Sequence, residues 1–118
     1  MVKAVVLAVV VAALIAVPAY AQSSRVTLKG EVGPGFSIEV GKGGKDLKTI
    51  KAGRYKIKVE DKGSIHNFHL FGPGLNKRTS IPFTGETTWT IRLKPGKYTY
   101  QCDAHASEGM KGSFKVTK

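Results

Sequence analysis

The stretch YTYQCDAHASEGMKG, residues 98–112, contains the only cysteine of the 118-residue chain, with a histidine three residues later and a methionine five residues beyond that. In its first part apolar side chains, Tyr98, Tyr100 and Cys102, alternate with polar ones, which is the pattern of a half-buried β-strand. The next seven residues, DAHASEG, have the composition of a loop. A loop that leaves the strand at Cys102 and returns after Gly112 can bring a thiolate, an imidazole and a thioether close together.

The rest of the chain after residue 22 shows short alternating runs and no stretch with the 3.6-residue apolar period of a helix. Turn sequences such as VGPGF, FGPGL and KPGK separate these runs. We expect seven strands, near residues 25–31, 36–40, 54–60, 65–71, 87–94, 96–102 and 112–117. The lysine-rich interval 41–51 indicates a hairpin loop or a weak edge strand. This pattern predicts an all-β fold, a Greek-key β-sandwich of about seven to eight strands.

The N-terminal sequence MVKAVVLAVVVAALIAVPAYAQSS has the features of a secretory signal. A positive charge at Lys3 precedes an apolar run from Ala4 to Val17 and a small-residue site that ends at Ala21. We expect a signal peptide at residues 1–21, one domain at residues 22–118, and a periplasmic or extracellular location. The alternative is an uncleaved N-terminal anchor, although the apolar run is shorter than the roughly 20 residues of a spanning helix.

The composition is strongly basic, with 19 Lys and Arg against 8 Asp and Glu and a formal net charge of +11. Such a charge attracts acidic partners and speeds their encounter. The lysines are spread over strands and turns without a helix or an aromatic platform, which argues against nucleic acid. We expect an acidic redox partner protein or an anionic membrane surface as partner, no small-molecule substrate, and a monomer. The alternative is a basic surface that is simply solvated.

The donor types around Cys102 indicate copper. Thiolate and thioether select copper(I), and a cysteine with two histidines and a distant methionine is a blue-copper arrangement. The second imidazole must be His66 or His69, because the chain has three histidines. In a regular strand these two point to opposite faces, so both cannot ligate. We favour His66, at the start of its strand, with Asn67 placed to hydrogen-bond a neighbouring loop, and expect His69 to be deeper, partly buried and engaged in an ordinary hydrogen bond.

Each donor also has a simpler interpretation. Cys102 could be a buried thiol, Met110 could fill a gap in the core, and His105 could be a solvated loop residue. These three simpler interpretations would all have to be correct at once, and the spacing that suits a metal site would then be accidental. One cysteine forms no internal disulfide, so in an oxidising compartment the thiol must be buried or occupied.

The chain resembles the small blue (type 1) copper proteins, the cupredoxin family of plastocyanin and azurin, in two motifs about 35 residues apart: Ile65-His66-Asn67 and Tyr98-x-Tyr100-x-Cys102-x-x-His105-x-x-x-x-Met110-x-Gly112. The loop spacing is closest to plastocyanin, and the likeness covers most of residues 22–118. It implies one copper ion that cycles between Cu(I) and Cu(II), with His66, Cys102 and His105 as equatorial ligands and Met110 as the axial ligand. It also implies that Asn67 locks the ligand loop. Plastocyanin-like loops often carry proline where this chain has Ala104.

Four protein ligands leave a metal ion no open position for a substrate, so we expect an electron carrier and not an enzyme. The resemblance implies that the electron leaves through His105, while Met110 tunes the potential. The alternative function is copper delivery, in which copper(I) is held for transfer, but Met110 is the only methionine after the first residue. Multicopper oxidases and copper nitrite reductases need more histidines than three, and the intact ligand set argues against a sandwich that has lost its metal.

Overall fold

The computed structural model describes residues 26–118. The predicted signal peptide at residues 1–21, like the alternative of an uncleaved anchor, lies outside the described residues. Within residues 26–118 no helix is long and apolar enough to cross a membrane.

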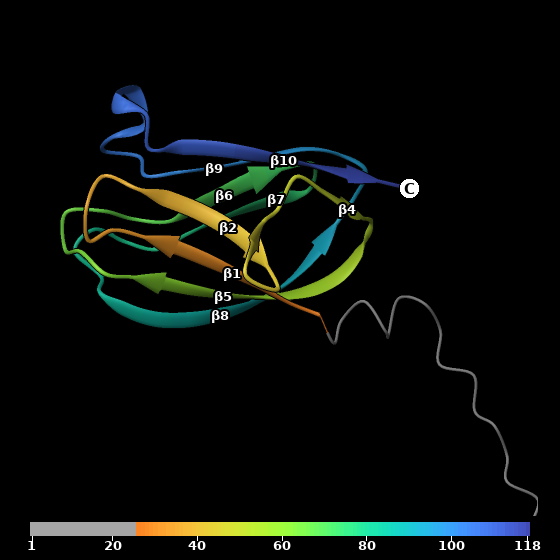
Figure 1. The fold of residues 1–118 in the computed structure, drawn as a ribbon, viewed down its shortest axis with the longest axis horizontal. Coiled ribbons are helices and arrows are strands. Elements are labelled where there is room, and N and C mark those ends of the chain that lie inside the picture. The colour runs from red at the N-terminus through yellow and green to blue at the C-terminus, as the bar shows by residue number, and fades with distance from the viewer. Residues whose placement is uncertain (1–25) are drawn as a thin grey trace, which may run out of the picture.

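The described chain forms ten strands and one short 3-10 helix, which Figure 1 labels in chain order. They are β1 (Thr27–Val32), β2 (Ile38–Lys42), β3 (Lys45–Asp46), β4 (Thr49–Lys51), β5 (Gly53–Asp61), β6 (His69–Gly72), β7 (Leu75–Arg78), β8 (Gly85–Leu93), β9 (Gly96–Gln101), the 3-10 helix η1 (Ala106–Glu108) and β10 (Lys111–Thr117).

The strands form two five-stranded sheets that pack face to face (Figure 1). The strand order is β3-β2-β1-β5-β8 in the first sheet and β4-β10-β9-β6-β7 in the second. The pairs β1–β5 and β4–β10 are parallel, and the remaining pairs are antiparallel. The predicted all-β sandwich is therefore confirmed.

The hydrophobic core lies between the two sheets, and it forms because apolar and polar residues alternate along the strands. In β5 the side chains of Tyr55, Ile57 and Val59 are buried, while the residues between them are exposed. Residues of one strand face opposite sides of a sheet in turn, so this pattern buries one face and leaves the other in water. At the centre, a Cβ on Gly30 would lie only 2.6 Å from Cζ of the buried Phe68, so the glycine makes room for that ring.

Two local predictions were wrong or incomplete, and a third was confirmed. The strand expected at 65–71 begins only at His69, because the Phe68 N–H and C=O bond the side chain and backbone of Thr79 and not a neighbouring strand. The sequence after the FGPGL turn, LNKR, forms the unpredicted strand β7 at a sheet edge. The lysine-rich interval 41–51 does hold weak edge strands, β3 and β4, as one of its two interpretations proposed.

The topology gathers three connections at one end of the sandwich. Figure 1 shows the β9–β10 loop with η1 at the same end as the β1–β2 and β5–β6 connections, while the chain enters β1 at the opposite end. The histidine of the β5–β6 connection thus comes close to the cysteine loop, although 36 residues separate His66 from Cys102.

Candidate metal centre

His66 lies in the turn between β5 and β6, where its backbone N–H donates to the Gly63 carbonyl over 3.1 Å. The side chain is fully buried. Two glycine backbones enclose the ring, since a Cβ on Gly33 or Gly63 would lie 3.0 or 3.1 Å from its Cδ2 atom. The packing therefore fixes the imidazole plane before any metal binds.

The loop after β9 closes on itself through backbone hydrogen bonds. The Cys102 N–H donates to the Met110 carbonyl over 3.1 Å, and the Met110 N–H donates to the His105 carbonyl over 3.2 Å. The His105 N–H in turn donates to the Cys102 carbonyl over 3.1 Å. Gly109 ends η1 with a φ of 97°, a left-handed conformation that favours glycine. These bonds close residues 102–110 into a compact loop, here called the clamp, which carries three candidate ligands. Cys102 and Met110 are buried in it, and His105 is partly exposed.

Three donor atoms converge between the turn and the clamp. Nδ1 of His66 lies 3.1 Å from Nδ1 of His105, and the Cys102 Sγ atom lies 3.7 Å and 3.4 Å from these two nitrogens. A point equidistant from all three atoms is about 2 Å from each, which matches the usual bond from nitrogen to a first-row metal ion and falls slightly short of a usual bond to sulfur. The donor triangle therefore has the size to hold one metal ion. Its soft sulfur donor and two imidazole nitrogens are ligand types that suit copper.

Two buried side-chain atoms have no hydrogen-bond partner within residues 26–118: Nε2 of His66 and Oδ2 of Asp61. Burial raises the pKa of Asp61, which the hydrogen bond from the Gly63 N–H and the field of His66 only partly oppose. Because Nδ1 of His66 faces the sulfur, its Nε2 atom is the nitrogen that carries the ring proton when a metal is bound at Nδ1.

Asn67 and Asp103 join the two ligand segments. The Asp103 N–H donates to Oδ1 of Asn67 over 2.8 Å, and Nδ2 of Asn67 donates to Oδ2 of Asp103 over 2.8 Å. Nδ1 of His69 contacts Oδ1 of Asp103 at 2.7 Å, and Gln101 donates to the same oxygen over 3.0 Å. Burial alone would raise the pKa of Asp103, but the hydrogen bonds from Gln101, Asn67 and His69 outweigh it and lower the pKa to about 2.

Phe36, in the β1–β2 connection, packs edge-on against both imidazoles. Its ring centroid lies 4.7 Å from that of His105 and 5.4 Å from that of His66. The phenyl ring is nevertheless 61% exposed, an unusual position for a large apolar side chain. It therefore covers the histidine pair and presents an apolar surface to the solvent at the same time.

No family model matches the sequence. Among solved structures, reduced rusticyanin matches with a TM-score of 0.57 at 24% identity, over 77% of this chain and 78% of that chain. A second structure, of the copper protein rusticyanin, gives 0.57 at 23% identity, over 77% and 76% of the two chains. Reduced auracyanin from the photosynthetic bacterium Roseiflexus castenholzii gives 0.50 at 19% identity, over 79% and 98%. The chain has the cupredoxin fold.

Within this cupredoxin sandwich, the structure places the predicted donors as follows. His66, Cys102 and His105 form a group whose ligand atoms lie within 4.8 Å of one another, and Met110 is buried on the same loop. This donor set fits one copper ion. His69 lies outside the group and makes ordinary hydrogen bonds to Asp103 and Asn76, as expected. The expectation that His69 is the deeper of the two histidines was wrong, since His66 is the fully buried one.

Sequence reasoning missed two residues at this candidate metal centre. Phe36 was read only as the boundary between a turn and the strand expected at 36–40, and its contacts to both imidazoles depend on the way in which two connections meet in space. Asp103 was read as part of a polar loop. Its position directly after the cysteine was the available signal, because a carboxylate there can reach the residues next to His66.

Proposed function

We propose that this protein is an exported type 1 blue copper protein that acts as a one-electron carrier between redox partners. One observation carries the proposal: two imidazole nitrogens and a thiol sulfur from separate segments form a triangle whose centre lies about 2 Å from each atom. Export rests on the N-terminal sequence and implies a periplasmic or extracellular location.

In this proposal His66, Cys102 and His105 are the equatorial ligands and Met110 is the axial one. Bound copper supplies the exchange of one electron between copper(II) and copper(I). The chain itself keeps the ligands nearly still during that exchange. The glycine backbones fix His66, the hydrogen-bonded clamp fixes the other ligands, and the Asn67–Asp103 bonds tie the two segments together.

His105 is the proposed exit for the electron, because it is partly exposed while His66 and Cys102 are fully buried. The neighbouring Phe36 offers apolar contact area to a docking protein. The full chain has a formal net charge of +11, and removal of residues 1–21 takes away only Lys3. The carrier would therefore attract an acidic redox protein over long range at low salt. We propose that it does so as a monomer.

The visible absorption of the copper(II) protein tests this function. Thiolate ligation predicts an intense blue colour, which Cys102→Ser should abolish while circular dichroism shows an intact fold. His69→Ala is the matched control, because His69 lies outside the donor triangle and its replacement should leave the protein blue. A colourless copper(II) form of the intact protein would contradict the proposal.

Copper delivery is the alternative that this site has to be tested against. The burial of His66, Cys102 and Met110, each at most 1% exposed, favours retention of the metal over handover. A comparison of the electron-exchange rate with the rate of copper(I) loss to a chelator separates the two functions. An electron carrier exchanges electrons much faster than it loses copper, whereas a delivery protein shows the reverse order.

A further inference from the structure

Charges are distributed unevenly on the outer face of the sheet β3-β2-β1-β5-β8. Toward the end that holds the metal centre, the lysines have carboxylate partners. Lys29 lies 3.2 Å from Glu31 and 3.7 Å from Glu60, and Lys62 lies 2.9 Å from Glu31. Lys58 of β5 lies 3.3 Å from Glu86 of β8. This part of the face is therefore close to neutral.

At the opposite end of the same face, the cations have no such partners. Arg54 of β5 is directly opposite Arg92 of β8 in the sheet register, and both side chains are exposed. Lys56 follows on the same face, opposite Thr90. Within residues 26–118 none of these three residues forms an ion pair with a carboxylate. Like charges directly opposite one another destabilise a sheet, so this arrangement has a cost in the absence of an anion.

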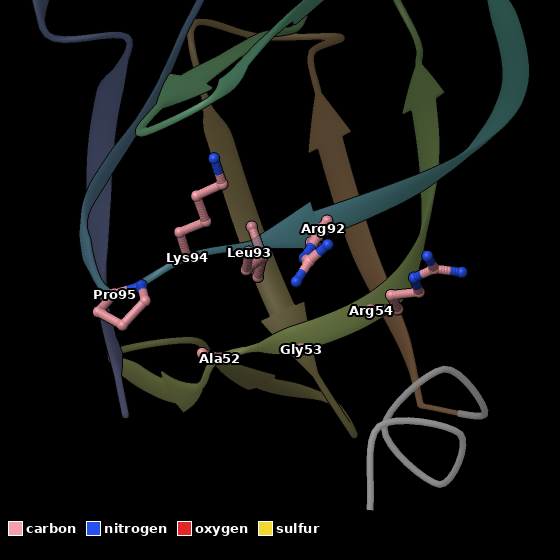
Figure 2. Close-up of a pocket in the computed structure, with 7 residues that line it drawn as sticks. All are labelled: Ala52, Gly53, Arg54, Arg92, Leu93, Lys94 and Pro95. Carbon is pink, nitrogen blue, oxygen red and sulfur yellow. The ribbon is translucent and has the colours of Figure 1, made fainter.

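A hollow of about 580 Å³ lies beside the arginine pair, and its lining contains no acidic residue. Figure 2 shows its seven lining residues: Ala52, Gly53, Arg54, Arg92, Leu93, Lys94 and Pro95. The Lys94 side chain extends away from the two arginines in this view. Its Nζ atom lies close to Gly74, 3.1 Å from the position that a Cβ would take there. In the same view the Arg54 side chain points away from Arg92, so a ligand held by both arginines requires the exposed Arg54 side chain to adopt another rotamer.

We propose that Arg54 and Arg92, supported by Lys56, bind a phosphate group at the end of the sandwich remote from the metal centre. A guanidinium is always charged at physiological pH, and its planar fork matches phosphate oxygens through paired hydrogen bonds. A phosphate anion between the two arginines would also remove their mutual repulsion. Inorganic phosphate and the headgroup of an anionic phospholipid present the same chemistry, and a membrane-bound headgroup would leave the metal centre facing away from the lipid surface.

Calorimetric titration with inorganic phosphate, and co-sedimentation with vesicles of phosphatidylcholine with or without phosphatidylglycerol, test this site on the full chain. The test variant is Arg54→Gln/Arg92→Gln. The control, Lys111→Gln/Lys115→Gln, removes the same charge from exposed positions of β10 in the other sheet. Arg54→Lys/Arg92→Lys keeps the charge and removes the planar fork. Circular dichroism establishes that each variant is folded.

The glutamine pair at 54 and 92 should weaken binding at least about tenfold, because two charge-assisted contacts are lost, while the β10 control stays within about twofold of the unchanged protein. The lysine pair should fall between them. Binding of inorganic phosphate points to the free anion as ligand, and binding only to vesicles with phosphatidylglycerol points to the headgroup. Equal losses in the test and control variants, or no binding of either probe by the unchanged protein, would overturn the proposal.

Discussion

Asp103→Ala removes the carboxylate that ties the ligand loop to the turn of His66. Folding lowers the pKa of Asp103 from 3.8 to about 2, a difference that corresponds to about 2 kcal/mol of preference for the ionised form in the folded state. The side chain is 30% exposed, so solvent screening reduces this value. The variant also leaves the buried Asn67 amide without this hydrogen-bond partner, and this loss adds to the destabilisation. We expect the free energy of unfolding of the metal-free protein to fall by about 1–2 kcal/mol near neutral pH.

The stabilisation by Asp103 should depend on pH, because its carboxyl group must be ionised to contribute. Because the pKa is lower in the folded state, the stabilisation is complete above the unfolded value of 3.8 and decreases as the pH falls toward about 2. Urea unfolding, followed by the fluorescence of the single tryptophan, Trp89, measures the difference near pH 7 and again near pH 3. Asp46→Ala, at an exposed position of β3, is the control and should change little. A loss for Asp103→Ala that is the same at both pH values would refute the reasoning.

Three further variants test other parts of the structure. Phe68→Ala empties the centre of the core beside Gly30 and should cost about 3–5 kcal/mol in urea unfolding, and a loss below about 1 kcal/mol would contradict the packing described. Phe36→Ala uncovers both imidazoles and should speed copper(I) loss to a chelator while the thermal midpoint of the metal-free protein stays nearly unchanged, because the ring is 61% exposed. Glu31→Gln breaks the ion pairs with Lys29 and Lys62, which lower the pKa of Glu31. The free energy of unfolding should fall by less than about 1 kcal/mol at low salt and should not change at high salt, where the pairs are screened.

The strands that the sequence predicted well are those with strict alternation. β5 alternates buried residues with more exposed ones, and β8 alternates exposed residues with half-buried or buried ones from Glu86 to Leu93. Both strands begin and end within about two residues of the expected bounds. β7 escaped prediction because its sequence, LNKR, is polar and lies at a sheet edge, where pairing to β6 and not burial creates the strand. η1 is a single turn, too short for any periodic pattern.

At the candidate site, local spacing and the fold contributed differently. The spacing of Cys102, His105 and Met110 was visible because one loop carries all three residues. The choice of His66 over His69 rested partly on strand geometry that the structure does not have, since His66 lies in a turn before β6. Its second ground, a hydrogen bond from Asn67 to a neighbouring loop, is confirmed by the bonds between Asn67 and Asp103. The His69–Asp103 contact joins residues 34 positions apart and has no local pattern from which it could be read.

X-ray absorption at the copper edge of the copper-loaded protein tests the central claim most directly, because it reports the atoms bonded to the metal. Convergence of His66, Cys102 and His105 on one point predicts two nitrogen neighbours and one sulfur neighbour at about 2 Å. A first shell of nitrogen and oxygen atoms alone, without sulfur, would contradict it.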